Sequence, residues 1–253
     1  MQVTVLGRWS PYPRGGEACS GYLIEHGDTC LLLECGNGVF SKVEQYASFW
    51  KLNAIVCSHL HADHCGDLPI IRNAVKSGML YQKIKDKMPV FLPSIPESNF
   101  DIISTYQDGL NLIIIEKLPN MGTVKSAVVN GTFTVSFFNV QHSMTSYGVI
   151  IEAGGKRLVY TGDTQLFPEL EAYAAGADLL ISEATVLNRN KDYAVGKHLT
   201  ATQAGSLARS SGVKKFLPSH FFPEYPLDEV KYEIEQGYGS RVEMAAEGMV
   251  IVL

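Results

Sequence analysis

The stretch Ser58-His59-Leu60-His61-Ala62-Asp63-His64 decides how the rest of this 253-residue sequence is interpreted. It follows Asn53-Ala54-Ile55-Val56-Cys57, a short, largely apolar run that predicts a buried strand. Three imidazoles and a carboxylate therefore fall within six residues at the end of a strand. Imidazole nitrogens and carboxylate oxygens suit zinc, iron or manganese. The whole chain has only seven histidines, so we interpret this segment as a metal-binding loop and not as an ordinary polar loop.

The amino-acid composition limits the classes of protein to which this chain can belong. Hydrophobic residues make up 46% of the chain and charged residues 19%, which allows a sizeable core. No apolar run approaches the roughly 18 residues that a membrane helix needs. The first seven residues form a strand pattern without the basic start of a signal peptide. Five cysteines without a CxxC spacing indicate reduced thiols. We therefore expect a cytoplasmic protein that makes no membrane contact.

Strand and helix patterns alternate along the chain without a linker, a repeat or a low-complexity segment, which predicts a single α/β domain over residues 1–253. We expect strands at residues 3–6, 21–25, 29–33, 53–57, 89–93, 147–152, 156–160, 178–181, 214–217, 242–244 and 249–253, and two more within 121–140 around the turn at Asn130-Gly131. We expect helices at residues 39–49, 68–77 (closed by Gly78), 97–107, 169–175 and 201–211. Thr200 and Gln203 predict a capping box for the last of these helices.

Further strands end at residues that bind metals or move protons. The residues that follow or close these strands are His142, Asp163, Glu183 and His220. In α/β sheets, ligand sites gather beyond the carboxyl ends of the strands, because the loops converge there. Together with the Ser58–His64 loop, five strand ends each deliver a His, Asp or Glu. The sequence therefore predicts one site at a common sheet edge.

The order of these residues resembles a known family. His59-x-His61-x-Asp63-His64, followed by His142, Asp163 and His220, is similar to the complete dinuclear signature of the metallo-β-lactamase-fold hydrolases. The resemblance implies a four-layer αββα sandwich with two divalent metal ions at one edge. It implies that His59, His61 and His142 hold the first ion, that Asp63, His64 and His220 hold the second, and that Asp163 bridges both. We expect zinc, with manganese or iron as alternatives, and a hydroxide nucleophile shared by ions roughly 3.5–4 Å apart.

Further motifs narrow the branch of the family. A bridging aspartate such as Asp163 is absent from the antibiotic-hydrolysing members and present in the glyoxalase II and phosphodiesterase branches. The stretch Ile181-Ser182-Glu183-Ala184-Thr185 is similar to the His-Glu-Ala-Thr motif of ribonuclease Z, and His198-Leu199-Thr200 to its later His-Ser/Thr motif. This similarity implies that Glu183 positions His198, which contacts the scissile phosphate and protonates the leaving oxygen. We assign catalytic roles to Asp63, His198 and Glu183.

The chain also departs from ribonuclease Z. Ser182 stands where the motif of that enzyme has a histidine, and only 20 residues separate His142 from Asp163, which leaves no room there for the arm that grips tRNA. The net charge of -5 disfavours a large nucleic acid. We therefore expect a small phosphodiester or a short nucleic acid as substrate. The loop at residues 8–16, with Trp9 and Arg14, suits an anionic ligand as well as it suits an ordinary surface loop.

Two neighbours of the metal-binding loop receive separate predictions. Cys65 adjoins His64, but the neighbour of a ligand usually points elsewhere, so we do not count it as a ligand. Asp67 is expected to orient a histidine from behind.

Other functions stay open on the sequence alone. The main enzymatic alternative is thioester hydrolysis of the glyoxalase II type, which usually comes with a helical C-terminal domain that this chain lacks; the next is tRNA processing of the ribonuclease Z type. The flavodiiron proteins replace a motif histidine with glutamate and carry a flavodoxin partner, and neither feature is present. The non-enzyme alternative is a metal-stabilised binding or sensor protein, which does not need all seven ligands. The oligomeric state, including a homodimer, is not decided.

Overall fold

The computed structural model describes residues 1–253 and contains two seven-stranded sheets. The first sheet has the strand order β14-β1-β2-β3-β4-β5-β6, with β1 at Gln2–Gly7, β2 at Gly21–His26, β3 at Thr29–Leu33, β4 at Leu52–Val56, β5 at Met88–Leu92, β6 at Leu110–Ile114 and β14 at Val250–Val252. The second has the order β13-β12-β11-β10-β9-β8-β7, with β7 at Asn120–Met121, β8 at Val124–Val129, β9 at Phe133–Asn139, β10 at Tyr147–Ala153, β11 at Lys156–Tyr160, β12 at Leu179–Glu183 and β13 at Phe216–Ser219.

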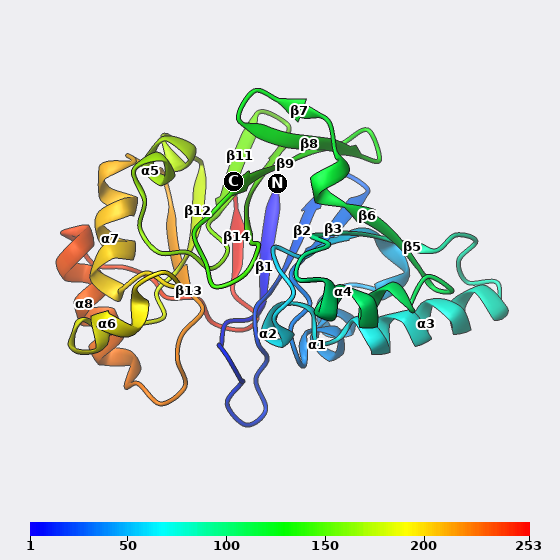
Figure 1. Cartoon of the computed structure of the whole chain (residues 1–253), viewed down its shortest axis with the longest axis horizontal. Helices are drawn as coiled ribbons and strands as arrows, with labels where there is room; N and C mark the ends of the chain where they lie inside the picture. The colour runs from blue at the N-terminus through cyan, green and yellow to red at the C-terminus, as the bar shows by residue number, and fades with distance from the viewer.

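Helices cover the outer face of each sheet, so that the molecule has four layers (Figure 1). Beside the first sheet lie α1 (Val39–Tyr46), α2 (Ala62–Cys65), α3 (Leu68–Leu80) and α4 (Glu97–Ser104), with the short 3-10 turns η1 (Phe49–Lys51) and η2 (Ile115–Lys117). Beside the second lie α5 (Pro168–Ala174), η3 (Asn188–Asn190), α6 (Lys191–Ala194), α7 (Ala201–Ser210) and α8 (Leu227–Tyr238). The predicted αββα sandwich is confirmed. None of the helices is both long enough and apolar enough to cross a lipid bilayer.

Alternation along the strands explains why the sheets stack. Successive side chains of a strand point to opposite faces. In β2, Tyr22 and Ile24 join the core between the two sheets, while Leu23 joins the core beneath the helices of the first sheet. The ring of Tyr22 lies 5.7 Å from that of Tyr160 in the second sheet. The same strand therefore serves two apolar cores and holds the layers together.

The strand directions bring the functional loops to one edge. In the second sheet β11, β12 and β13 are parallel, and β9 runs the same way because β10 is antiparallel to both β9 and β11. In the first sheet β3, β4 and β5 are parallel. The carboxyl ends of β9, β11, β12 and β13 consequently share an edge, which is the arrangement that the sequence predicted.

Several predicted boundaries were wrong. The helix predicted to close at Gly78 runs on to Leu80; a Cβ atom at Gly78 would lie 2.4 Å from the Trp50 ring, so this glycine serves close packing instead of ending the helix. The helix expected at residues 39–49 stops at Tyr46 and is followed by η1, and that expected at 97–107 stops at Ser104. Residues 242–244 form no strand, although Ala245 N–H donates to Pro218 O and anchors this segment.

Sequence reasoning also missed β6 and α8. Helix α8 is amphipathic, with Val230 and Ile234 on its buried face. It packs very closely against α7, because Gly205 on α7 and Gly237 on α8 leave no room for a Cβ atom.

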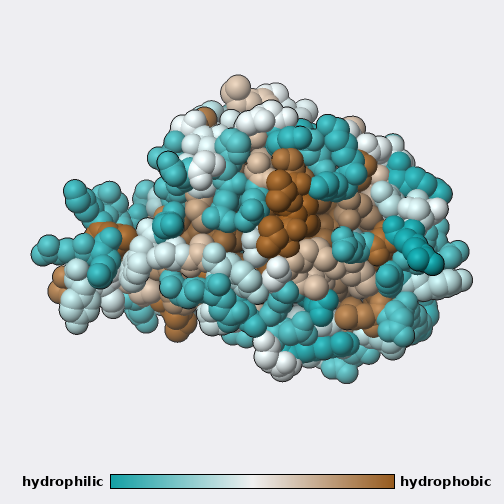
Figure 2. All heavy atoms as spheres, turned by 180° about the vertical axis from the view of Figure 1, so that it is seen from behind, coloured by the Kyte–Doolittle hydropathy of each residue, from teal (hydrophilic) through white to brown (hydrophobic).

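Strand β14 forms the outer edge of the first sheet. Val250 and Val252 are 51% and 62% exposed, and Figure 2 shows a hydrophobic ridge on the back of the molecule, over the place that β14 occupies in Figure 1. Lys215 Nζ donates to Val252 O at 2.6 Å. A lysine that covers an outward carbonyl is one of the means by which proteins block pairing at a sheet edge.

Candidate metal centre

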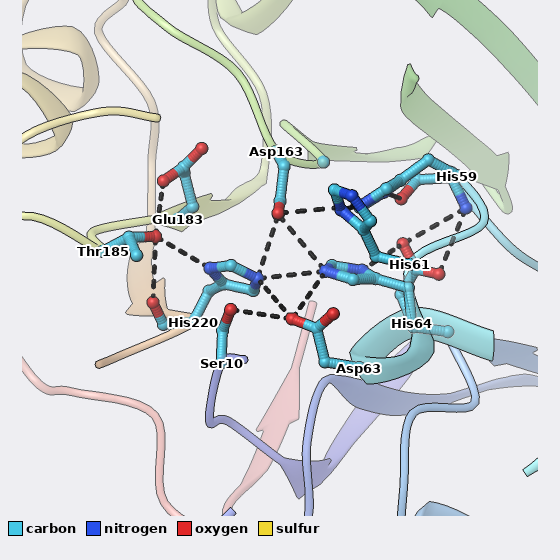
Figure 3. Close-up of polar contacts among 12 residues, drawn as sticks. Ser10, His59, His61, Asp63, His64, Asp163, Glu183, Thr185 and His220 are labelled. Atoms are coloured by element: carbon cyan, nitrogen blue, oxygen red, sulfur yellow. Dashed lines mark hydrogen bonds and ion pairs between the residues drawn. The ribbon is translucent and has the colours of Figure 1, made fainter. Parts of the chain in front are cut away.

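The fold brings the seven side chains predicted as ligands together at the carboxyl-end edge of the sheets. Figure 3 labels all of them except His142. They come from the loop and helix α2 after β4 (His59, His61, Asp63, His64), from the segments after β9 (His142) and β11 (Asp163), and from the end of β13 (His220). Their donor atoms fall into two groups on either side of Asp163, and Asp163 and His220 also form a third possible group with His198. Each group is built from segments that are far apart in the sequence.

The first group consists of His59, His61 and His142. His59 Nε2 lies 2.9 Å from His61 Nδ1, and His142 Nε2 lies 3.2 Å from the same nitrogen. Nitrogen ligands at 2.0–2.1 Å from a tetrahedral zinc are about 3.3 Å apart. The three ring nitrogens thus converge at nearly the spacing that one metal ion requires.

The second group consists of Asp63, His64 and His220. The Nε2 atoms of the two histidines are 3.0 Å apart, and Asp63 Oδ2 lies 3.5 Å from each of them. Together these atoms form a second, separate set of converging donors.

Asp163 faces both groups. Its Oδ2 lies 3.7 Å from His59 Nε2 and 3.9 Å from His142 Nε2, while its Oδ1 lies 3.4 Å from His64 Nε2 and 3.0 Å from His220 Nε2. Oδ1 is buried without a hydrogen-bond partner. A buried carboxylate oxygen is costly unless a proton donor or a cation satisfies it. The residues present therefore fit a site for cations.

Polar groups behind the histidines fix the orientation of the rings. His142 Nδ1 donates to Lys197 O at 2.7 Å, and Ser58 Oγ lies 3.0 Å from His59 Nδ1. Thr185 Oγ1 donates to Glu183 Oε2 at 2.6 Å and lies 2.8 Å from His220 Nδ1, from which it accepts. These contacts orient the rings so that the Nε2 atoms of the three histidines face the cluster. Supporting contacts of this kind accompany most metal-binding histidines.

Glu34 supports the second group and was missed by sequence reasoning. It is completely buried, accepts from Ser58 N–H at 3.1 and 3.2 Å, and places Oε1 3.3 Å from His64 Nδ1. The signal was available, because Glu34 directly follows β3 and the strand-end rule applies to it.

The prediction that Asp67 orients a histidine was wrong. Its carboxylate accepts from Gly38 N–H at 3.1 Å and from Phe40 N–H at 2.7 Å, so it caps the start of α1. The thiol of Cys65 donates to His61 O and is not part of the cluster, in agreement with the prediction.

The loop at residues 8–16 contacts the site through Ser10, which sequence reasoning did not single out. Ser10 Oγ donates to Asp63 Oδ2 at 2.7 Å. Trp9 is completely buried, Arg8 Nη1 donates to Ala245 O at 2.7 Å, and Arg14 Nη2 donates to Pro223 O at 2.6 Å. The guanidinium groups therefore hold the loop on the protein and do not face the cluster.

Backbone strain concentrates at this site. His220 and Glu34 have left-handed φ values of 60° and 61°. Gly162, directly before Asp163, has φ 60°, and a Cβ atom there would lie 2.7 Å from Tyr147 O. Such conformations cost about 1–3 kcal/mol each for residues other than glycine and persist only where the surroundings enforce them. The fold thus forces one ligand candidate, His220, and the residue that supports another, Glu34, into conformations that they would not adopt by themselves.

Burial and charge set the protonation of the first group. Burial lowers the pKa of His59 well below its usual value, and the nearby positive charge of His64 lowers it further. Burial also lowers the pKa values of His61 and His142. All three imidazoles are consequently neutral, which is the form that binds a metal.

Buried carboxylates surround His64 in the second group. Burial raises the pKa of Asp163, but the charges of His220 and His64 outweigh it and hold the pKa well below its usual value. Burial disfavours protonation of His64, yet the charges of Asp163, Asp63 and Glu34 outweigh it and raise the pKa of His64 well above its usual value. No lysine or arginine is buried anywhere in the molecule. The carboxylates around His64 therefore favour positive charge at this position.

His198 and Glu183, both predicted to act in catalysis, lie beside Asp163. His198 Nδ1 is 3.1 Å from Glu183 Oε2 and 3.9 Å from Asp163 Oδ2. Burial opposes protonation of His198, but the charge and hydrogen bond of Glu183 outweigh it and raise the pKa to about 9. Glu183 also accepts from Thr164 N–H at 2.6 Å. Ser182 donates to Glu183 O and does not reach the cluster.

Comparisons with known proteins agree with this geometry. The family described as the beta-lactamase superfamily domain matches residues 29–221. The probable metallo-hydrolase YhfI of Bacillus subtilis is 30% identical over 251 residues, which cover 99% of each chain. Its crystal structure superimposes with a TM-score of 0.89 at 28% identity, covering 99% of this chain and 98% of that one. Ribonuclease Z of Bradyrhizobium is 27% identical over 291 residues, covering 92% of this chain and 93% of the relative. The chain therefore belongs to the beta-lactamase superfamily and is one of its metallo-hydrolases.

Proposed function

We propose that the protein is a dinuclear metal-dependent phosphodiesterase that hydrolyses small phosphodiesters. The observation that carries the proposal is that the two carboxylate oxygens of Asp163 face separate groups of donors. His59, His61 and His142 would hold the first ion, Asp63, His64 and His220 the second, and Asp163 would bridge them. Zinc suits this mixture of nitrogen and oxygen donors, with manganese or iron as alternatives.

The charge of the site supports two ions instead of one. Glu183 is paired with His198, which leaves Glu34, Asp63 and Asp163 with a formal charge of -3 and no buried lysine or arginine nearby. A single divalent ion would leave the site negative, and it would repel an anionic phosphodiester. Two divalent ions make it positive by one charge. When bound, such ions polarise the phosphoryl group and lower the pKa of water.

His198 is placed to donate a proton to the leaving oxygen. Its Nδ1 is held by Glu183, which is itself fixed by Thr164 N–H and by the hydroxyl of Thr185. This leaves Nε2 available as the proton donor. A positioned acid of this kind typically contributes roughly 10²–10⁴-fold to the rate. Glu183 acts as a positioning residue, because it fixes the ring without approaching the substrate.

Three further observations support a small phosphodiester. The relative named ribonuclease Z supports phosphodiester cleavage as the reaction. The segment between His142 and Asp163 is occupied by the hairpin of β10 and β11, so an arm for gripping tRNA has no place there. The net charge of -5 disfavours attraction to a large nucleic acid.

Hydrolysis of bis(p-nitrophenyl) phosphate tests the proposal. We expect activity that a chelator abolishes and zinc restores. A precursor tRNA and a glutathione thioester are assayed in parallel, because they represent the rival activities. Efficient, salt-sensitive processing of the tRNA with negligible activity on the small diester would contradict the proposal, as would turnover of the thioester alone.

A further inference from the structure

A pocket lined by aromatic side chains lies next to the candidate metal centre. Its volume is about 310 Å³, and its lining consists of Thr185, Val186, Asn190, Tyr193, Phe222 and Tyr225. Small-molecule sites typically begin at roughly 300 Å³. Tyr193 is 60% exposed, so its ring is not held at this place by burial in the core. The pocket thus has the size and the apolar walls of a ligand subsite.

Two contacts connect the pocket to the metal centre. The ring of Tyr193 is stacked on that of His198, with centroids 6.2 Å apart and planes at 15°. The hydroxyl of Thr185, which also lines the pocket, lies between Glu183 and His220, as Figure 3 shows. A single imidazole therefore separates the aromatic wall from Asp163.

The chemistry of the pocket suits a planar, hydrogen-bonding ring. Phe222 and Tyr225 meet edge to face with centroids 5.0 Å apart, and both line the pocket together with Tyr193. Asn190 Oδ1 accepts from Tyr225 O–H at 2.9 Å, which directs the amide and leaves its N–H groups as donors. Nucleobases stack on aromatic side chains and expose acceptors at their edges.

A cation completes the site for an anionic ligand. The ammonium group of Lys197 lies 4.6 Å from the centre of the Tyr193 ring. The carbonyl of the same residue accepts from His142 Nδ1. The segment that carries Lys197 therefore touches both the aromatic wall and the metal centre, and it brings a positive charge to the boundary between them.

We propose that this pocket binds the nucleobase of a nucleoside phosphodiester while the phosphate lies at the metal centre. The inference rests on the proposed function, because it places the phosphate of the substrate in that site. It names the class of substrate: a phosphodiester with a base is preferred over a sugar phosphate without one. Tyr193 and Phe222 provide the stacking faces, and Asn190 provides a donor for the edge of the base.

Binding of reaction-product analogues tests this inference independently of turnover. Isothermal titration of the zinc-loaded protein compares adenosine 5′-monophosphate with ribose 5-phosphate. We expect the nucleotide to bind more tightly, and Tyr193→Ala to weaken its binding by roughly 5- to 100-fold, the range for loss of one base-aromatic stack. Binding of ribose 5-phosphate should not change. Tyr193→Phe should retain the affinity, because it keeps the ring.

Tyr81→Ala is the matched control. Tyr81 is 73% exposed at the end of α3, beside the other sheet, and its replacement should alter neither affinity. Equal binding of the two ligands by the wild type, or an unchanged nucleotide affinity in Tyr193→Ala, would overturn the inference. Preferential nucleotide binding without hydrolysis of any phosphodiester would support the pocket and contradict the proposed reaction.

Discussion

The two groups of donors differ in burial and in charge. In the first group His61 is half-buried, whereas the side chains of His59 and His142 are 0% and 1% exposed, and all three members are imidazoles. In the second group Asp63, His64 and His220 are 6%, 0% and 1% exposed, and one member is a carboxylate. The first group is therefore neutral and meets solvent only at His61, whereas the second contains a carboxylate and is closed.

The two groups of donors also differ in how many protein groups hold their side chains in place. Ser10 holds Asp63, Glu34 faces His64, and Thr185 holds His220. The first group depends on one hydroxyl and one backbone carbonyl, and no protein group supports His61 Nε2. We infer that the second group binds its ion more tightly and that the first group is the one that admits substrate.

Loss of Asp163 should have the largest effect, because this residue alone belongs to both groups. Asp163→Ala is expected to lose at least one metal ion and to abolish hydrolysis of bis(p-nitrophenyl) phosphate. Elemental analysis and the activity assay measure the two effects. Asp163→Asn, which keeps the shape of the side chain, serves as a second variant if the alanine variant does not fold. Full metal content in both variants would show that the two groups do not share this ligand.

Loss of His198 should affect turnover and not metal content. His198→Ala is expected to lower kcat by roughly 10²–10⁴-fold, because the proton donor is removed while all seven predicted ligands remain. His26→Ala is the matched control, since His26 packs against Phe133 away from the site. Loss of metal from the His198 variant would make His198 a ligand, and full activity would remove it from the reaction.

Loss of Glu34 should weaken metal binding at the second group only. This variant therefore tests the difference between the two groups of donors. Glu34→Gln removes the negative charge behind His64 and is expected to lower metal affinity at this group by roughly 10- to 100-fold, the usual effect of changing a partner of a ligand. Competition with a coloured chelator measures the two affinities separately. Unchanged affinity at the second group would show that this buried carboxylate serves packing alone.

Asp67→Asn is the control for that experiment, because Asp67 is another buried carboxylate close to α2. Its contacts go to the first backbone N–H groups of α1. We expect both metal affinities to be retained and the free energy of unfolding to fall by about 0.5–2 kcal/mol, the range for loss of a helix cap.

The ligand candidates could be predicted from the sequence, and most of their supports could not. Each candidate follows a recognisable strand, and parallel strands end at the same edge, so local patterns were enough to bring His142, Asp163 and His220 together. The bond between Ser10 and Asp63 joins residues 53 positions apart, and no local pattern encodes it. Asp67 was misassigned for the same reason, since its partners depend on where α1 begins. Glu34 could have been found, because it directly follows β3.

The fold, too, could be predicted where local patterns determine it and not where tertiary contacts do. The strands that flank strong turn signals were placed within a few residues, whereas Gly78 was taken for a helix end because its contact with Trp50 is tertiary. Helix α8 carries an amphipathic pattern that is detectable in the sequence, but its close approach to α7 through Gly205 and Gly237 is not.

The number of metal ions per chain tests the central claim most directly. Protein purified without chelator and reconstituted with zinc is analysed by inductively coupled plasma mass spectrometry against an accurate protein concentration. The geometry of Asp163 and the charge of the site predict two ions per chain. A ratio of one that further reconstitution does not raise would contradict the dinuclear centre.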